Sequence, residues 1–306
     1  VDYKKALTQT KTSKGLPLLY VKNTTNGLFT AAYYYKVGEE ANKWLPVAAE
    51  YFDYLGTKKM TAAQLKQQFY KLACTVSFKT APDGTFIMLN GLNDNMPKAV
   101  ALLEDFLANA KVDQEAYSQY VALTDKARKD EKLNQNANFS RLCLYGQYGP
   151  YNKALNTPSV AEMQAKNPQE LVDLVKGLKS YEHTLLYYGP SSADEFAAVI
   201  SKAHKTAKRL QAVPAAKAYA EQPTPQNEIL LAPYEAKNIY MRMYHNEGRK
   251  WNPSQEPVVW MFNEYYGGGM NTVVFQELRE SRALAYSAWA DYSTPSRLSD
   301  TESAYA

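Results

Sequence analysis

The chain has 306 residues, 45% of them hydrophobic and 22% charged, which is typical of a globular protein with a large core. Its net charge of +4 comes from 35 Lys and Arg against 31 Asp and Glu mixed along the sequence, so no basic patch predicts nucleic-acid binding. The sequence has no run of about 18 apolar residues, so no membrane span is predicted.

Hydrophobic patterns predict alternating strands and helices over the first two thirds of the chain. The strands are expected over residues 16–22, 27–37, 74–80, 85–91 and 183–189. The helices are expected over residues 42–55, 61–72, 96–108, 113–145, 167–178 and 191–210. Thr61 with Gln64 forms a capping-box pattern, and Asn167 before Pro168 is a second helix start.

Composition changes over residues 212–226, where three prolines stand among Ala, Lys and Gln. Proline stiffens and extends such a stretch, so it predicts a linker between a first lobe, residues 1–211, and a second lobe, residues 227–306. The second lobe is expected to hold strands and helices in the order seen over residues 16–80. Its predicted elements are strands 228–231 and 237–244, helix 253–265, helix 270–282 and strand 284–292.

Few residues in the chain are suited to metal binding. Cys74 and Cys143 are too few for a disulfide scaffold or a zinc knuckle, and we expect packed thiols. The three histidines, His183, His204 and His245, stand on different elements without metal-ligand spacing. The chain starts at Val1 and stops within a patterned region, so we expect part of a longer polypeptide. Its compartment is left open, with the bacterial periplasm or envelope as one option.

The most informative segment is residues 266–286. Gly267, Gly268 and Gly269 allow positive φ angles or a close backbone approach, and a helical pattern with Arg279 and then Tyr286 follows. A phosphate loop is not predicted, because Gly-Met-Asn stands where the Walker motif has Gly-Lys-Ser/Thr. A plain turn before a helix is the other interpretation of the glycines.

The run Gly-Gly-Gly-Met-Asn-x3-Phe-Gln-Glu-Leu-Arg-Glu-x-Arg-x-Leu-Ala-Tyr resembles the pitrilysin/insulinase-type metallopeptidases, which include the mitochondrial processing peptidases. An earlier signature from Gly38 through Trp44 and Glu50 to Gly56 supports this resemblance, which covers essentially the whole chain. It implies an α+β fold of two related lobes, each a mostly antiparallel sheet packed against helices. Two such halves enclose a peptide chamber, and here the second lobe is expected to be incomplete.

In the family, the active half carries His-x-x-Glu-His on a helix, where two imidazoles bind zinc and the Glu activates water. In this chain the motif falls on Val47, Glu50 and Tyr51, so both histidines are replaced and only the Glu type remains. The third ligand falls near Asp125. The resemblance therefore implies neither a catalytic residue nor a metal ligand in this chain, and places zinc in a partner catalytic half.

The resemblance implies that the zinc-free half closes the chamber and offers Arg279 and Tyr286 to the substrate. Arginine can donate two hydrogen bonds to a carbonyl or carboxylate, and a Tyr hydroxyl can stabilise a tetrahedral oxyanion. Ala285 stands where the family usually has Gly, and its Cβ is expected to shift Tyr286. In the alternative interpretation, Arg279 only pairs with Glu280, Glu277 or another lobe, and Tyr286 only starts a strand.

Two partners are expected. One is the catalytic zinc half, in the same polypeptide or a separate subunit, and the other is an unfolded or extended peptide. Residues 83–92 are expected to add that peptide at a sheet edge. The alternative function is a non-enzymatic scaffold, like the core subunits of respiratory complexes that share this fold, using both lobes for protein contacts only.

Overall fold

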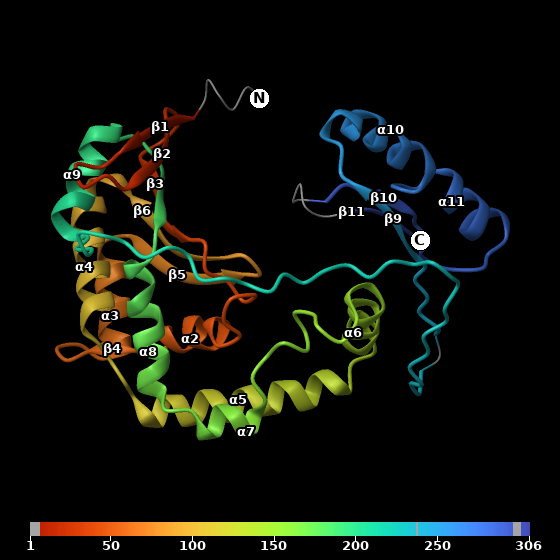
Figure 1. The fold of residues 1–306 in the computed structure, drawn as a ribbon, viewed down its shortest axis with the longest axis horizontal. Coiled ribbons are helices and arrows are strands. Elements are labelled where there is room, and N and C mark those ends of the chain that lie inside the picture. Colours follow the sequence, from red (N-terminus) through yellow and green to blue (C-terminus); the bar gives the residue numbers. More distant parts are fainter. Residues whose placement is uncertain (1–6, 237, 296–300) are drawn as a thin grey trace. The chain divides into compact units, whose positions relative to one another are not determined.

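The computed structural model describes residues 7–236, 238–295 and 301–306, and Figure 1 labels its elements. The chain forms two compact units, residues 1–127 with 157–218 and residues 128–156 with 219–306. These units differ from the predicted lobes in grouping residues 128–156 with the C-terminal part. Residues 212–226 contain neither helix nor strand. None of the described helices is long and apolar enough to cross a membrane.

The N-terminal unit is built on a six-stranded sheet of order β1-β2-β8-β3-β6-β5. Strands β2 and β8 run parallel, and the other neighbouring pairs are antiparallel. The strands are β1 (Thr8–Lys11), β2 (Pro17–Lys22), β3 (Leu28–Tyr35), β5 (Cys74–Ala81), β6 (Gly84–Leu92) and β8 (His183–Gly189). A separate short pair consists of β4 (Gly56–Thr57) and β7 (Ala110–Lys111).

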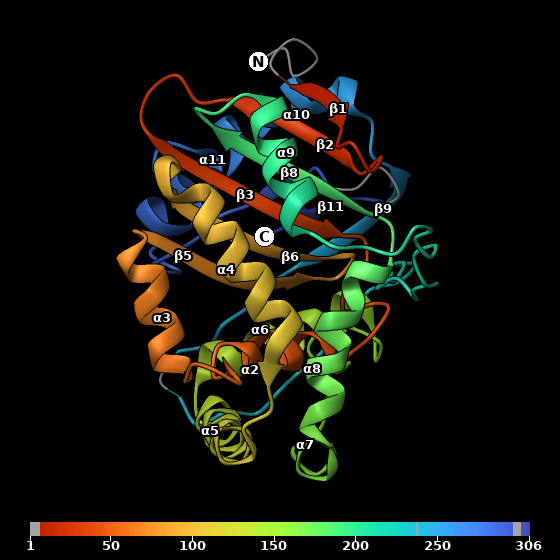
Figure 2. The same cartoon turned by 90° about the vertical axis from the view of Figure 1, so that its left-hand side faces the viewer.

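Helices α4 (Met96–Asn109) and α9 (Ala193–Ala203) lie across one face of this sheet (Figure 2). Phe196 of α9 stacks on Tyr187 of β8, with ring centroids 4.3 Å apart, which anchors that helix to the sheet. The other helices of this unit are α2 (Leu45–Phe52), α3 (Ala62–Lys71), α7 (Val160–Ala165), α8 (Pro168–Gly177) and most of α5 (Gln114–Lys132), whose residues 128–132 belong to the C-terminal unit. Helix α2 packs on α8 and β5.

The predicted hairpin is confirmed, since Ala81 pairs with Gly84 and leaves a two-residue turn. The edge position predicted for residues 83–92 is wrong, because β6 lies between β3 and β5. Both sides of β6 are already paired, so a peptide cannot add there. The predicted caps are also confirmed: Thr61 and Gln64 cap α3 reciprocally, and the Asn167 side chain accepts from the Gln169 amide.

Two predicted helices end earlier than expected. The helix predicted over 113–145 is divided into α5 and α6 (Gln135–Tyr148), because the Asn134 side chain accepts from the Ala137 amide and starts a new helix. The helix predicted over 191–210 ends at Ala203. There His204 adopts an extended conformation, and its imidazole enters a buried hydrogen-bond network described below.

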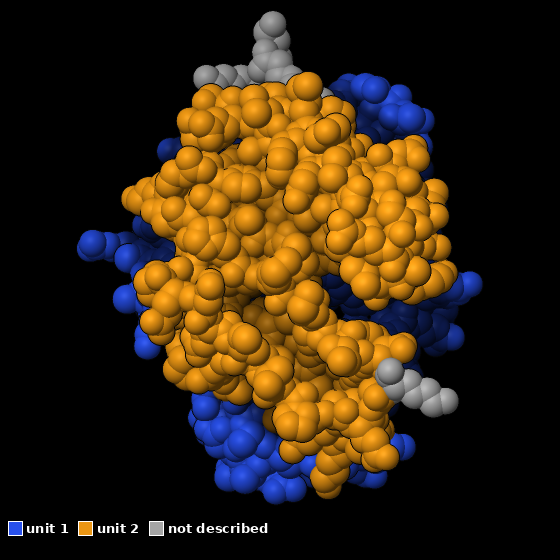
Figure 3. All heavy atoms as spheres, turned by 90° about the vertical axis from the view of Figure 1, so that its right-hand side faces the viewer, with its two compact units in different colours: residues 1–127, 157–218 blue, residues 128–156, 219–306 orange. Residues whose placement is uncertain are grey.

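The C-terminal unit, distinguished by colour in Figure 3, holds a three-stranded antiparallel sheet of order β10-β11-β9. The Asn263 side chain of α10 (Glu256–Tyr266) accepts from the Tyr292 amide at 2.8 Å and donates to the Tyr292 carbonyl at 3.0 Å. These two bonds join α10 to the sheet. The elements are α6, β9 (Tyr244–Lys250), α10 (Glu256–Tyr266), α11 (Val273–Phe275), a π-helical turn (Gln276–Ser281), β10 (Asp291–Ser293) and β11 (Thr301–Tyr305). The predicted α+β class is confirmed.

Several C-terminal predictions are wrong. Residues 228–231 and 238–243 form no strand, and Lys237 lies outside the described residues. Ile229 and Ile239 are 83% and 95% exposed. The apolar side chains that suggested strands here are therefore not packed against a sheet. The helix predicted over 270–282 is a short α-helix followed by a π-helical turn. Of the strand predicted over 284–292, only Asp291 and Tyr292 pair in a sheet, as part of β10.

Candidate functional site

Helix α2 carries Val47, Glu50 and Tyr51, the residues that the sequence resemblance assigns to the inverted zinc motif. Their i, i+4 spacing puts Val47 and Tyr51 on one face, and that face is buried: the two residues are 5% and 0% exposed. Glu50 points away and is exposed. Val47 and Tyr51, which the resemblance assigns to the two imidazole positions, therefore belong to the hydrophobic core.

Tyr51 has a fully bonded hydroxyl. It donates to the Asp113 carbonyl at 2.8 Å and accepts from the Asp113 amide at 3.1 Å. Burial raises the pKa of the Tyr51 phenol. Tyr51 therefore acts as a neutral clamp between α2 and the start of α5.

Glu50 is held by a second tyrosine, because the Tyr120 hydroxyl donates to Glu50 Oε2 at 2.7 Å. Burial first, and then the bond to Glu50 and its negative charge, raise the pKa of the Tyr120 phenol well above its ordinary value. Asp125 lies further along α5 and has an interaction of its own. Within residues 7–236, 238–295 and 301–306, no group of three or more His, Cys, Asp or Glu could hold a metal ion.

Tyr51, Tyr54, Tyr117 and Tyr120 form a tyrosine cluster between α2 and α5. Tyr51 meets Tyr117 edge-on at 5.1 Å, and Tyr54 lies 5.7 Å from Tyr120. Tyr117 also donates to the Met163 carbonyl at 2.8 Å. A Tyr phenol is ordinarily neutral near pH 7, and burial raises the pKa of Tyr51, Tyr117 and Tyr120 further. Neutral phenols are not among the usual zinc ligands, so the cluster is structural.

The glycine run follows the end of α10. A Cβ on Gly267 would lie 2.1 Å from the Ala290 carbonyl oxygen, so the predicted close approach is present there, within the same chain. A Cβ on Gly268 would lie 2.9 Å from the Asn263 carbonyl oxygen, whereas Gly269 has open space. The positive φ angles expected for these glycines are not found. Gly267 is therefore required by packing and not by conformation.

Arg279 and Tyr286 lie against each other. The Arg279 guanidinium is 4.8 Å from the Tyr286 ring and 4.8 Å from the Phe275 ring. Its Nε is 3.5 Å from Glu280 Oε1, so the ion pair of the alternative interpretation is also present. Tyr286 is 87% exposed. The pair thus presents a cation and a phenol on the surface of the C-terminal unit.

A chain reversal brings this pair together. Ala283 has φ of 50°, the Ala283 amide donates to the Arg279 carbonyl, and the Leu284 amide donates to the Leu278 carbonyl at 2.9 Å. These bonds resemble a Schellman helix end and turn Tyr286 back over Arg279. In a continuous helix the two residues would be about 10 Å apart along the axis. The sequence predicted the residues but not this contact.

The sequence also gave no sign that His183 and His204 meet. Their Nε2 atoms are 3.0 Å apart, and His204 Nδ1 is 2.8 Å from Glu104 Oε1. His183 Nδ1 is 2.7 Å from the Tyr181 carbonyl oxygen. Both imidazoles are buried, and residues this far apart in sequence show no local pattern. We call this set the Glu-His-His network.

Counting protons fixes the roles in the network. The Tyr181 carbonyl only accepts, so His183 Nδ1 carries a hydrogen, and Nε2 of the neutral His183 ring accepts from His204. His204 Nδ1 and Glu104 then share one proton. Burial lowers the pKa of His183. Burial would raise the pKa of Glu104, but the hydrogen bond and charge of His204 hold it below the ordinary value of 4.5.

No family model matches this sequence, and none of the curated proteins matches it. Solved structures do. The periplasmic protease PqqL from Escherichia coli has 14% identity over 98% of this chain, with a TM-score of 0.75. A peptidase M16 inactive domain from Pseudomonas fluorescens has 16% identity over 98% of the chain, with a TM-score of 0.69.

A mutant of the ferredoxin protease FusC in complex with Arabidopsis ferredoxin has 11% identity over 100% of the chain, with a TM-score of 0.74. The chain spans about a third (34%) of the PqqL and FusC chains and 73% of the Pseudomonas domain. The likeness to mitochondrial processing peptidases stays a prediction. The chain therefore has the fold of M16-type peptidase halves, the pitrilysin/insulinase class that its sequence resembles.

Proposed function

We propose that this protein is the zinc-free half of a zinc metalloendopeptidase, and that it closes the peptide chamber and contacts the substrate through Arg279 and Tyr286. The buried, metal-incompatible surroundings of Val47 and Tyr51 support the zinc-free role. So does the fold shared with a domain described as an inactive M16 domain. The zinc belongs to the partner half, in the same polypeptide or a separate subunit.

One observation carries the substrate-contacting role. Arg279 and Tyr286 are seven residues apart, yet the guanidinium lies 4.8 Å from an 87% exposed Tyr ring. The ring contact and the ion pair of Nε with Glu280 hold the guanidinium, and its terminal N–H groups are suited to a peptide carbonyl or carboxylate. The exposed hydroxyl of Tyr286 is suited to a developing oxyanion.

Variant kinetics test the two roles. The 306-residue chain is combined with a zinc-bearing half that carries His-x-x-Glu-His, and cleavage of a flexible fluorogenic peptide is followed. Arg279→Ala is expected to raise KM about tenfold, because it removes ground-state binding as well as transition-state binding. Tyr286→Phe is expected to lower kcat on the order of 10²-fold, because it removes an oxyanion donor.

Arg282→Ala is the matched control, because Arg282 is a nearby exposed arginine whose Nε lies 3.5 Å from a Glu277 carboxylate oxygen. It should change kcat and KM by less than about twofold. Wild-type kinetics for both Arg279→Ala and Tyr286→Phe would contradict the substrate-contacting role. If the chain bound the zinc half but never altered cleavage, the scaffold function would be the better description.

A further inference from the structure

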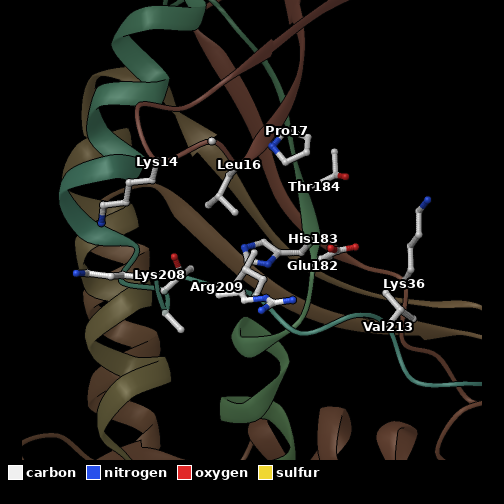
Figure 4. Close-up of a pocket in the computed structure, with 14 residues that line it drawn as sticks. Lys14, Leu16, Pro17, Lys36, Glu182, His183, Thr184, Lys208, Arg209 and Val213 are labelled. Atoms are coloured by element: carbon white, nitrogen blue, oxygen red, sulfur yellow. The ribbon is translucent and has the colours of Figure 1, made fainter.

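A pocket of about 590 Å³ lies entirely within the N-terminal unit, and Figure 4 shows the 14 residues that line it. Four segments form it: residues 14–17 before β2, Lys36 after β3, residues 182–184 at the start of β8, and residues 206–213 after α9. Its volume is in the range of small-ligand and peptide side-chain sites, about 300–1,000 Å³.

The rim of this pocket is cationic. Lys14, Lys36, Lys208 and Arg209 line it, against the single carboxylate of Glu182. All five are exposed, and none has an ion-pair partner among the residues that the structure describes. Of these five side chains, only that of Lys14 makes a hydrogen bond to a residue that the structure describes, a long one of 3.4 Å to the His204 carbonyl oxygen. The pocket therefore gathers positive charge that the protein does not neutralise.

The floor of the pocket is apolar and held in place. Leu16 is 4% exposed, and Leu210 and Val213 are half-buried. The Gln211 amide donates to the Ser180 carbonyl at 2.8 Å, and its carbonyl accepts from the Glu182 amide at 2.9 Å. These bonds fix the segment after α9 beside β8, so the site is formed before any ligand arrives.

The Glu-His-His network lies beneath the pocket through His183, which also lines it. The network has no net charge, because His204 and Glu104 share one proton and His183 is neutral. Both nitrogens of His183 are already bonded, so this ring offers surface and not a hydrogen bond to a ligand. A bound ligand would therefore be contacted by the cationic side chains and by the hydroxyls of Thr184 and Thr206.

The cations are spread along the pocket and do not converge on one point. Figure 4 shows Lys14 and Lys208 directed to one side, Lys36 on the opposite side and Arg209 between them. A single phosphate could reach only part of this set, whereas an extended chain with several carboxylates could reach both sides. An apolar side chain between the carboxylates would cover the floor at Leu210.

From these observations we propose that the pocket binds an acidic stretch of extended polypeptide, in which carboxylates flank an apolar side chain. All the groups involved belong to the N-terminal unit, so this binding goes beyond the proposed function and needs neither the catalytic half nor Arg279. It is tested without a zinc half, so its failure would leave the cleavage experiment unaffected.

The test measures fluorescence anisotropy of a labelled nine-residue peptide of Glu-Glu-Leu repeats with the full 306-residue chain. The double variant Lys208→Glu with Arg209→Glu is expected to weaken binding at least about tenfold, because attraction becomes repulsion. Lys36→Glu, at the opposite side, should weaken it about threefold or more. The matched control is Lys202→Glu with Lys205→Glu, which makes the same charge change at exposed residues outside the pocket lining.

The proposal predicts saturable binding that the control variant changes less than about twofold, and no binding of the corresponding Lys-Lys-Leu peptide. Equal weakening by the control would overturn the proposal in favour of unspecific charge attraction. Tight binding of tripolyphosphate with no binding of the acidic peptide would also overturn it and indicate a small-anion site. Circular dichroism of each variant confirms that the fold is retained.

Discussion

Tyr51, which the resemblance assigns to a metal-ligand position, is part of the hydrophobic core. A histidine ligand needs an open side toward the ion, whereas Tyr51 is fully buried and bonds both backbone groups of Asp113. With Val47 on the same face, the helix gains apolar burial and loses the two nitrogens that would hold zinc. Glu50 keeps its residue type but bonds Tyr120, so its presence alone is no evidence of catalysis.

Tyr51→Phe tests this interpretation. It removes the only hydrogen bond that the structure shows for the Asp113 amide and one of two at the Asp113 carbonyl, which still accepts from the Tyr117 amide. The free energy of unfolding should therefore fall by about 1–3 kcal/mol in urea denaturation. Tyr54→Phe is the control, since Tyr54 is 40% exposed and its hydroxyl makes no hydrogen bond to a residue that the structure describes. It should change stability by less than about 0.5 kcal/mol. Equal losses for both variants would show that the Tyr51 hydroxyl is not a clamp.

The Glu-His-His network makes stability depend on pH. The pKa of His183 is lowered from 6.5 by burial, so the unfolded chain binds a proton at a higher pH than the folded one. This contribution is present above pH 6.5 and is lost as the pH falls through the folded value. The pKa of Glu104 is also below its ordinary 4.5, so its contribution is lost at still lower pH.

The free energy of unfolding is therefore expected to fall on acidification from pH 6.5, by up to about 1.4 kcal/mol per pH unit for this one proton. Urea titrations between pH ~7.5 and ~5 measure it. His183→Gln should be less stable at neutral pH and flatten the slope. A slope unchanged in that variant would mean that the acid sensitivity arises elsewhere in the chain.

At the scale of elements, the turn after α10 depends on one glycine of three. Gly267→Ala would put a Cβ 2.1 Å from the backbone oxygen of Ala290, which neither element can relieve without moving. We expect it to destabilise the C-terminal unit by about 1–3 kcal/mol. Gly269→Ala meets no atom within 4 Å and should cost less than about 1 kcal/mol. Thermal unfolding measures the stability of both variants. Equal stabilities would contradict the argument that Gly267 is needed for the close approach to Ala290.

Sequence predicted the elements of the N-terminal unit well because their apolar faces are buried. The β5–β6 hairpin and the Thr61 cap follow from local residues, and so they were found. The division at Asn134 was missed because a single cap outweighed a continuous helical pattern. Exposed apolar runs such as residues 228–231 predicted strands for which no neighbouring strand exists.

The candidate site was predicted only in part, because its contacts depend on how the chain folds and not on local residue patterns. Residue types suggested Arg279 and Tyr286, but their contact depends on the reversal at Ala283, a non-glycine residue at positive φ. The Glu-His-His network joins three elements, and no local pattern reports a contact over 100 residues. The position of β6 inside the sheet likewise depends on β3 and β5 together.

At the scale of the whole molecule, the fold is shared with solved M16-type structures at 11–16% identity. A fold can persist at such low identity because it depends on the burial pattern, whereas a zinc site depends on a few side chains. This chain keeps the fold, but its described residues include no group of His, Cys, Asp and Glu that could hold a metal ion. We therefore expect its function to depend on a second half, as the proposed peptidase role requires.

The most direct measurement compares cleavage of a flexible peptide by the zinc-bearing half alone and after addition of this chain. The proposal predicts that kcat/KM rises at least about tenfold and saturates near one chain per zinc half, because the added chain closes the chamber and brings its own substrate contacts. The 306-residue chain alone should cleave nothing. Full activity of the zinc half without this chain, or cleavage by this chain alone, would contradict the account.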